Sequence, residues 1–203
     1  MHPLSPAVSA LAFLLAPAWG QEDAQTSPPV LDKPVKDFRL RDLMKDAETW
    51  VSLSDYKGKK AVVLIFASYN CDASLDYGNR ILKLVKDFSG QEVAFLGVRS
   101  SAEDDAAGMR KYAESKGLGI PFLEDPKNVL ASDLGVLVTP TFFVIDKEGV
   151  LRYRGAYDES LEEARAKKKY VHDALRAVLD GKEVALKSTR AVGCVMPRVD
   201  PGK

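Results

Sequence analysis

The sequence predicts an α/β protein with a central mixed β-sheet, flanking helices and a β-hairpin at the N-terminal end of the domain. Three mostly apolar runs, at 61–66, 93–98 and 141–145, have the composition of strands that are buried on both faces. Segments with helical spacing of apolar residues separate these runs, which is the pattern of parallel strands joined by helices. A turn at 146–149 leads directly into a further strand at 150–154, so we expect one edge of the sheet to be antiparallel.

The remaining elements are predicted from periodicity and from turn residues. Alternating apolar residues predict two hairpin strands before the first buried run, and apolar residues at helical spacing, closed by Gly90, predict a helix after it. In chain order, the expected elements are hairpin strands at 38–43 and 49–53, a helix at 75–88, a polar helix at 102–116, an extended piece at 122–123, a short helix at 127–134 and a long charged helix at 159–179.

The chain is long enough for one well-packed domain and short for two. Residues 7–18 are apolar and uncharged and end in Ala18-Trp19-Gly20, as is typical of a secretory signal peptide and its cleavage site. The apolar run is too short to span a bilayer, and a buried N-terminal helix is the alternative. We therefore expect a periplasmic or secreted protein without a membrane span after signal removal. Its expected parts are a signal peptide at 1–20, a flexible leader at 21–34, a single domain at 35–181 and a C-terminal tail at 182–203.

Composition argues against several classes of function. The 203 residues include 29 basic and 29 acidic side chains, so no positive excess indicates a nucleic acid or an anionic membrane as partner. The chain has no glycine-rich phosphate-binding loop. Its two cysteines lack the spacing of a zinc or iron–sulfur site, and His172 is the one histidine beyond the signal peptide. We therefore expect neither a metal nor an organic cofactor.

Cys71 is the residue best placed for chemistry, because it follows the first buried strand at the expected start of the next helix. A strand that feeds a helix places such a residue at the carboxyl end of the sheet, where α/β proteins keep their sites. The free N–H groups and the dipole of a helix N-terminus favour a thiolate over a thiol, although the neighbouring Asp72 opposes this effect. The alternative is an inert cysteine buried in the core.

Pro140 is unusual because it stands at the beginning of a buried run, where a missing N–H is normally avoided. A cis bond between Thr139 and Pro140 would form a fixed turn beside Cys71. The preceding backbone would then be free to pair with an extended peptide. An ordinary trans proline that starts a strand is the alternative.

Three segments resemble the thioredoxin superfamily. Residues 66–74, Phe-Ala-Ser-Tyr-Asn-Cys-Asp-Ala-Ser, resemble its active-site segment, 138–146 resembles its cis-proline segment, and 150–155 resembles the strand that follows. The separation of cysteine and proline is similar to that of the larger redoxin branch, which includes the alkyl hydroperoxide reductase/thiol-specific antioxidant (AhpC/TSA) family. The resemblance covers about 33–194. It implies a thioredoxin-like fold and thiol redox chemistry, on disulfides or, as in the antioxidant peroxiredoxins, on peroxides.

Two positions depart from the patterns of this superfamily. Dithiol exchange of the thioredoxin type needs a second cysteine where Ser74 stands, and peroxiredoxins usually have proline where Leu64 stands. Ser68 matches their hydroxyl residue three positions before the cysteine, and it is a candidate to bond the Cys71 sulfur or a bound peroxide. Arg152 and Arg154 are candidates for the arginine of a peroxide site. The expected substrate-binding residues are Tyr69, Asn70, Thr139, Pro140 and Arg154.

Cys194 is the one internal thiol that can resolve an intermediate on Cys71. The segment 189–194, which ends in Gly-Cys, resembles a C-terminal cysteine segment of some peroxiredoxin-like proteins. Three relations between the two cysteines are open: a pair that forms and breaks during turnover, a static disulfide that closes a long loop, and no pairing.

Three functions are compatible with these residues. The first is an exported thiol-dependent oxidoreductase, in which the Cys71 thiolate attacks a protein disulfide or a peroxide. Cys194 or an external thiol reductant then resolves the intermediate. The missing peroxiredoxin proline favours disulfide chemistry. The main alternative is a non-catalytic binding module that holds an extended peptide in the groove beside Pro140, and a third interpretation is a monothiol chaperone or isomerase.

Overall fold

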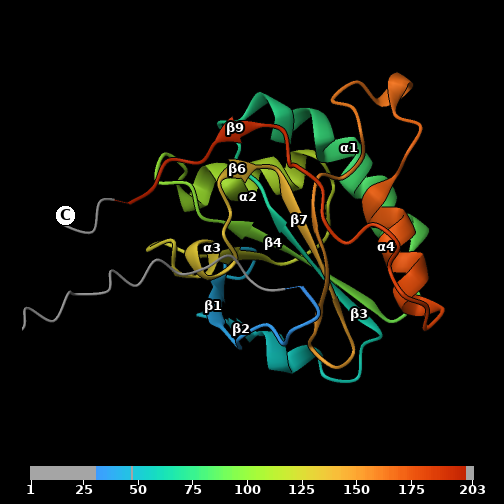
Figure 1. Cartoon of the computed structure of the whole chain (residues 1–203). Coiled ribbons are helices and arrows are strands. Elements are labelled where there is room, and N and C mark those ends of the chain that lie inside the picture. The colour runs from blue at the N-terminus through green and yellow to red at the C-terminus, as the bar shows by residue number, and fades with distance from the viewer. Residues whose placement is uncertain (1–30, 47, 200–203) are drawn as a thin grey trace, which may run out of the picture.

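The computed structural model describes residues 31–46 and 48–199, which form a seven-stranded sheet with helices on both faces (Figure 1). The strands of this sheet are β1 (Arg39–Asp42), β2 (Trp50–Ser52), β3 (Ala61–Phe66), β4 (Val93–Arg99), β5 (Phe122–Glu124), β7 (Thr141–Asp146) and β8 (Leu151–Gly155). Their order is β2-β1-β5-β4-β3-β7-β8. β5, β4 and β3 are parallel and form the centre, whereas β7 and β8 continue the sheet in antiparallel fashion.

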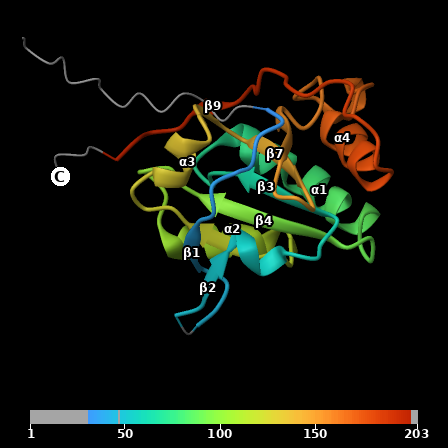
Figure 2. The ribbon, with the colours of Figure 1, turned by 60° about the horizontal axis from the view of Figure 1, so that its bottom comes forward.

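The expected antiparallel edge is present at β7 and β8, and the opposite edge of the sheet is antiparallel as well. The predicted hairpin of β1 and β2 is present, and β1 pairs antiparallel with β5 at the edge away from β8 (Figure 2). Without this pairing, β5 would be an edge strand with free backbone N–H and C=O groups. The hairpin therefore completes the sheet instead of standing beside it.

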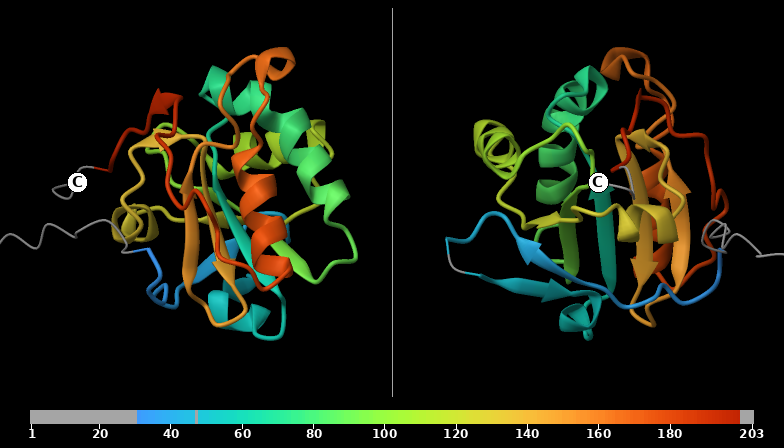
Figure 3. Two further views of the ribbon diagram at one scale, coloured as in Figure 1. Left: turned by 45° about the vertical axis from the view of Figure 1, so that its right-hand side comes forward. Right: turned by 90° about the vertical axis from the view of Figure 1, so that its left-hand side faces the viewer.

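Two apolar layers lie between the sheet and the elements that cover it. The helices are α1 (Asp72–Asp87), α2 (Ala106–Ser115), α3 (Val129–Asp133) and α4 (Tyr170–Leu179). α1, α2 and α4 bury their apolar faces on one side of the sheet, and the short α3 covers part of the other side. α1 and α4 lie side by side (Figure 3), and His172 Nε2 of α4 is 3.0 Å from Asp87 Oδ2 of α1. Successive strand residues such as Phe142 and Phe143 belong to opposite layers, as the pleat requires.

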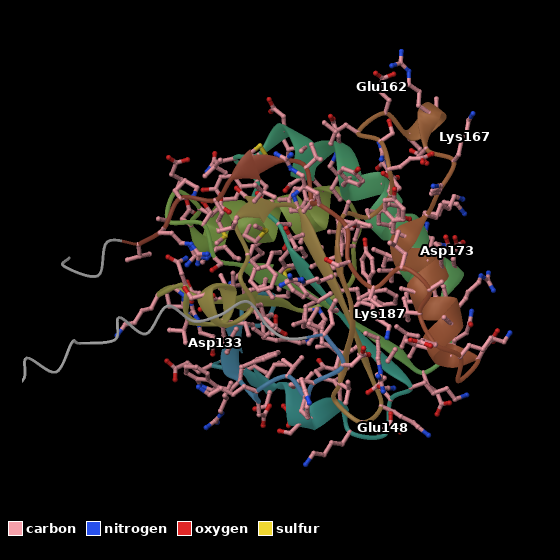
Figure 4. All side chains as sticks on the ribbon, viewed as in Figure 1. Asp133, Glu148, Glu162, Lys167, Asp173 and Lys187 are labelled. Carbon is pink, nitrogen blue, oxygen red and sulfur yellow. A yellow bond between two sulfur atoms is a disulfide. The ribbon has the colours of Figure 1, made fainter. Side chains whose placement is uncertain are left out.

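The long charged helix expected at 159–179 is wrong in its first half. α4 begins at Tyr170, and the preceding loop contains one 3-10 turn at Glu163–Arg165. Leu161 is the one large apolar residue between 159 and 169. This stretch therefore has no apolar face to bury, and burial of such a face is the main source of helix stability in proteins. The labelled side chains of this loop, Glu162 and Lys167, point away from the molecule (Figure 4).

The C-terminal tail, residues 182–203, returns across the sheet as far as it is described. It first follows the edge of β8, where the Arg154 backbone bonds to Lys187 O at 3.0 Å and to Thr189 N at 3.1 Å. It then forms β9 (Cys194–Val195), which pairs with β6 (Val138–Thr139) in a separate two-stranded sheet (Figure 1). The sequence indicates no regular element in the tail, because so short a strand is defined only by its partner.

The expected signal peptide at 1–20 and most of the expected leader at 21–34 lie outside the described residues. Of the helices in the described part of the chain, none combines the length and the apolar character needed to cross a bilayer.

Candidate active site

Cys71 lies where the sequence predicts, between a central strand and a helix. It is the N-cap residue of α1, its carbonyl accepts from Leu75 N at 3.0 Å, and its own N–H donates to Ser68 O at 3.3 Å. The side chain of Cys71 makes no cap hydrogen bond to the first turn of α1. The free N–H groups of that turn therefore lie next to the sulfur, where they stabilise negative charge when the cysteine is reduced. In the described structure Cys71 is only 1% exposed.

Cys71 and Cys194 form a disulfide, with their Cα atoms 5.7 Å apart. The alternative of two unpaired cysteines is therefore wrong for this structure. The strand pair β6–β9 places Cys194 opposite Thr139, and the Thr139–Pro140 bond is cis, as predicted. The carbonyl oxygen of Thr139 is 3.1 Å from Cys71 Sγ. Since neither sulfur of a disulfide carries a proton, this is a contact in the oxidised form, and a thiol at Cys71 would donate to the same oxygen.

Ser68 and Ser74 belong to a buried polar network beside the cysteine. Ser68 Oγ donates to Asp104 Oδ1 at 2.8 Å, and Ser68 N donates to Ser74 Oγ at 3.3 Å. Burial raises the pKa of the Asp104 carboxyl, although Ser68 and Asn70 both donate hydrogen bonds to it. Asp104 Oδ2 is buried without a hydrogen-bond partner among the described residues. The network fixes the turn that presents Cys71, and the sequence analysis missed the role of Asp104.

Tyr69 and Asn70 contact the segment that leads into α2. Tyr69 Oη donates to Asp105 Oδ2 at 2.9 Å and accepts from Asp105 N at 3.0 Å, while Asn70 Nδ2 donates to Glu103 O at 3.0 Å. The Tyr69 ring also covers Gly108, where a Cβ atom would lie 2.4 Å from the ring. Both side chains therefore brace the loop that leads to Cys71, and their contact with a substrate stays a prediction.

The two candidate arginines lie on β8, two residues apart. Arg152 forms ion pairs with Asp146 at 2.5 Å and Asp32 at 2.9 Å. Asp146 is opposite the first residue of β3, whereas Cys71 follows the other end of that strand, so the structure does not bring Arg152 to the sulfur. Arg154 is opposite Phe143 of β7, and its backbone bonds to the tail.

A cavity of about 490 Å³ lies beside Pro140, between the loop at 156–162 and the tail. Arg80 of α1 fixes this loop: it is 4% exposed, it donates to both carboxylate oxygens of Asp158 at 2.9 and 3.1 Å, and it donates to Ser160 O at 2.8 Å. Sequence reasoning missed this pair because arginine is normally exposed. The available signal was the helical spacing, which places Arg80 on the apolar face with Leu84.

The sheet, the cysteine at a helix N-cap and the cis-proline that faces it define a protein of the thioredoxin-like redoxin class. The family model of the AhpC/TSA family matches residues 31–154, and the chain belongs to that family. It is 29% identical over 156 residues to the thiol:disulfide interchange protein DsbE of Yersinia pestis, with 74% of this chain and 77% of that protein covered. A hypothetical protein from Sinorhizobium meliloti has a similar structure, with a TM-score of 0.76, 26% identity and coverage of 86% of this chain and 98% of that chain. A putative DsbE from Chlorobium tepidum shares the fold, with a TM-score of 0.61, 21% identity and coverage of 74% and 99%.

Proposed function

We propose that the protein is an exported thiol–disulfide oxidoreductase in which Cys71 attacks the substrate and Cys194 resolves the intermediate. The observation that carries this proposal is the disulfide between a helix N-cap cysteine and a cysteine on β9. β9 pairs with β6 directly before the cis-proline, which is the edge that an extended peptide would use. The relatives named thiol:disulfide interchange protein support the same chemistry.

The reaction needs only the two thiols of the reduced protein. The Cys71 thiolate attacks one sulfur of a substrate disulfide; the bond between Cys71 and that sulfur forms, and the other substrate sulfur leaves as a thiolate and takes a proton from water. The Cys194 thiolate then attacks the Cys71 sulfur, which forms the observed disulfide and releases the first substrate sulfur as a thiol. Two electrons pass from the protein to the substrate, and an external thiol reductant restores the protein by the same exchange.

The environment of Cys71 favours disulfide over peroxide chemistry. Ser68 Oγ donates to Asp104, so its proton is already used, and Arg152 is paired at the other end of the sheet. A peroxidatic site would need such donors directed at the peroxide. A cis-proline beside the sulfur instead suits the backbone of a peptide.

Export is supported by the apolar run at 7–18 and by the disulfide, since such bonds persist in oxidising compartments. The mature chain would begin at Gln21. N-terminal sequencing of the protein from a periplasmic or culture-medium fraction tests this, and recovery of an intact Met1 from the cytoplasm would contradict it.

The activity is tested with the reduced full-length protein, with disulfide-bonded insulin and hydrogen peroxide as separate oxidants. We expect insulin to convert the wild type to the Cys71–Cys194 disulfide. Cys194→Ser should instead accumulate a covalent adduct through Cys71, and Cys71→Ser should form none. If the reduced protein reacts with hydrogen peroxide but not with insulin, the protein is a peroxidase and the proposal is wrong. Peptide binding without any thiol reaction, unchanged in Cys71→Ser, would favour the binding module.

A further inference from the structure

The tail occupies the backbone edge that a substrate peptide would use. Thr139 is in register with Cys194 and Val138 with Val195, and Met196 N donates to Leu137 O at 2.9 Å. β6 belongs to no other sheet. Removal of the tail would therefore leave β6 with free N–H and C=O groups beside Cys71, a template for another extended segment.

The position before Cys194 has no space for a side chain. A Cβ atom at Gly193 would lie 2.0 Å from Thr139 O, 2.7 Å from Thr139 C and 3.2 Å from Pro140 Cδ. The two closest atoms belong to the backbone of β6, so they cannot rotate away as a side chain would. In this register, only glycine fits directly before the cysteine.

The two positions after the cysteine have opposite environments. Val195 is 79% exposed, whereas Met196 is 3% exposed and belongs to the apolar layer that contains Leu130 and Leu134. This alternation follows from the strand geometry, which turns the second residue after an inward-facing cysteine inward again. The site therefore has a place for a large apolar side chain two residues after the cysteine and no preference at the residue between.

We infer that the tail is an internal copy of the substrate and that Cys71 acts on protein disulfides whose attacked cysteine lies in an extended segment Gly-Cys-x-apolar. This rests on the proposed function and adds the substrate class to it. The segment takes the place of 193–196 on β6, and its cysteine sulfur bonds to Cys71 while its disulfide partner leaves as a thiolate. The tail must then return to the same edge before Cys194 can attack Cys71.

The test uses the full-length Cys194→Ser variant and an eight-residue peptide with the sequence of 191–198, its cysteine activated as a mixed disulfide with nitrothiobenzoate. Attack by Cys71 releases the coloured nitrothiobenzoate thiolate, so absorbance gives the second-order rate constant. The tail of the variant competes equally with every peptide, so ratios of rate constants report on the groove. The three modified peptides have Gly→Ala before the cysteine, Val→Asp one residue after it, or Met→Asp two residues after it.

We expect the Gly→Ala and Met→Asp peptides to react about tenfold or more slowly than the parent, because each conflicts with a packed or apolar position. Val→Asp carries the same charge as Met→Asp at an exposed position, and it should stay within about twofold of the parent. Loss of discrimination at either the Gly or the Met position overturns the inference but leaves the proposed function intact. If Cys71 reacts with none of the four peptides and also not with insulin, the proposed function itself is refuted.

Discussion

Loss of the Cys71–Cys194 disulfide should cost the protein a large part of its stability, mainly through the unfolded state. The bond joins residues 123 positions apart, and the chain-entropy relation gives about 16 cal/mol/K for such a loop, or about 5 kcal/mol at 25 °C. In the native state the tail keeps other anchors, such as Thr189 N to Arg154 O and the buried Met196. The native structure should therefore change little, and the cost should approach the entropic value. For a chain of this size it corresponds to a fall of about 10–20 °C in Tm.

The assay is thermal unfolding of the oxidised protein, the protein reduced with dithiothreitol, and the Cys194→Ser variant. The variant, measured with and without reductant, is the control and should give one Tm. Folding and disulfide formation are linked in a thermodynamic cycle: the disulfide stabilises the folded state by the same free energy by which folding stabilises the disulfide. This linkage provides a second measurement. The equilibrium constant with glutathione should thus be about 4000-fold larger in the native protein than in urea. If Tm falls by less than about 4 °C on loss of the disulfide, the entropic reasoning is refuted.

Three further predictions concern ionisable groups that are buried or half-buried. Asp158→Asn removes the buried counter-charge of the Arg80 guanidinium and leaves it only a longer ion pair, at 3.9 Å, with the exposed Glu163. It should cost about 3–5 kcal/mol in urea unfolding, most of which Arg80→Met in the same chain should restore. Burial raises the pKa of Asp104, so the native state is penalised as pH rises above the ordinary value of 3.8. Asp104→Asn should therefore gain stability relative to the wild type as pH increases from 4 to 7, and a constant difference would contradict this. Burial lowers the pKa of His172 despite its bond to Asp87, so stability should be lost as pH falls below 6.5; His172→Gln should flatten the stability profile there.

Much of the fold could be predicted from the sequence because its centre is made of local signals. The run 61–66 is long, apolar and followed by a helical pattern, so β3, the start of α1 and the position of Cys71 between them follow from neighbouring residues alone. Pro140 could be singled out for a similar reason, since proline before a buried strand conflicts with the pairing that the strand needs.

The other half of the site could not be predicted because it depends on contacts between distant segments. β9 has two residues and no periodicity, and it exists only because β6 offers it a partner. Asp104 looks like a cap residue in the sequence, and its burial becomes visible only when Ser68 is placed beside it. The charged residues of the loop before α4 have high helix propensity and so predict a helix, but the missing apolar face decides the structure.

The location of the second thiol determines the order of the proposed steps. Ser74 is fully buried in the first turn of α1, three residues after Cys71. A cysteine at this position would be held by the helix and not by β6, so it could attack Cys71 while a substrate strand still lies on β6. Cys194 instead approaches along β6 itself, so the substrate strand and the resolving thiol cannot be bound together.

The double variant Ser74→Cys/Cys194→Ser separates these two situations. Its helical thiol should resolve the adduct with insulin without waiting for β6, so the adduct that persists in Cys194→Ser should disappear. Added peptide of the sequence 191–198, with serine for its cysteine, should slow resolution in the wild type by holding β6, but not in the double variant. Adduct lifetimes from acid-quenched samples measure both effects, and equal sensitivity of the two proteins to the peptide would show that the tail does not compete with substrate for β6.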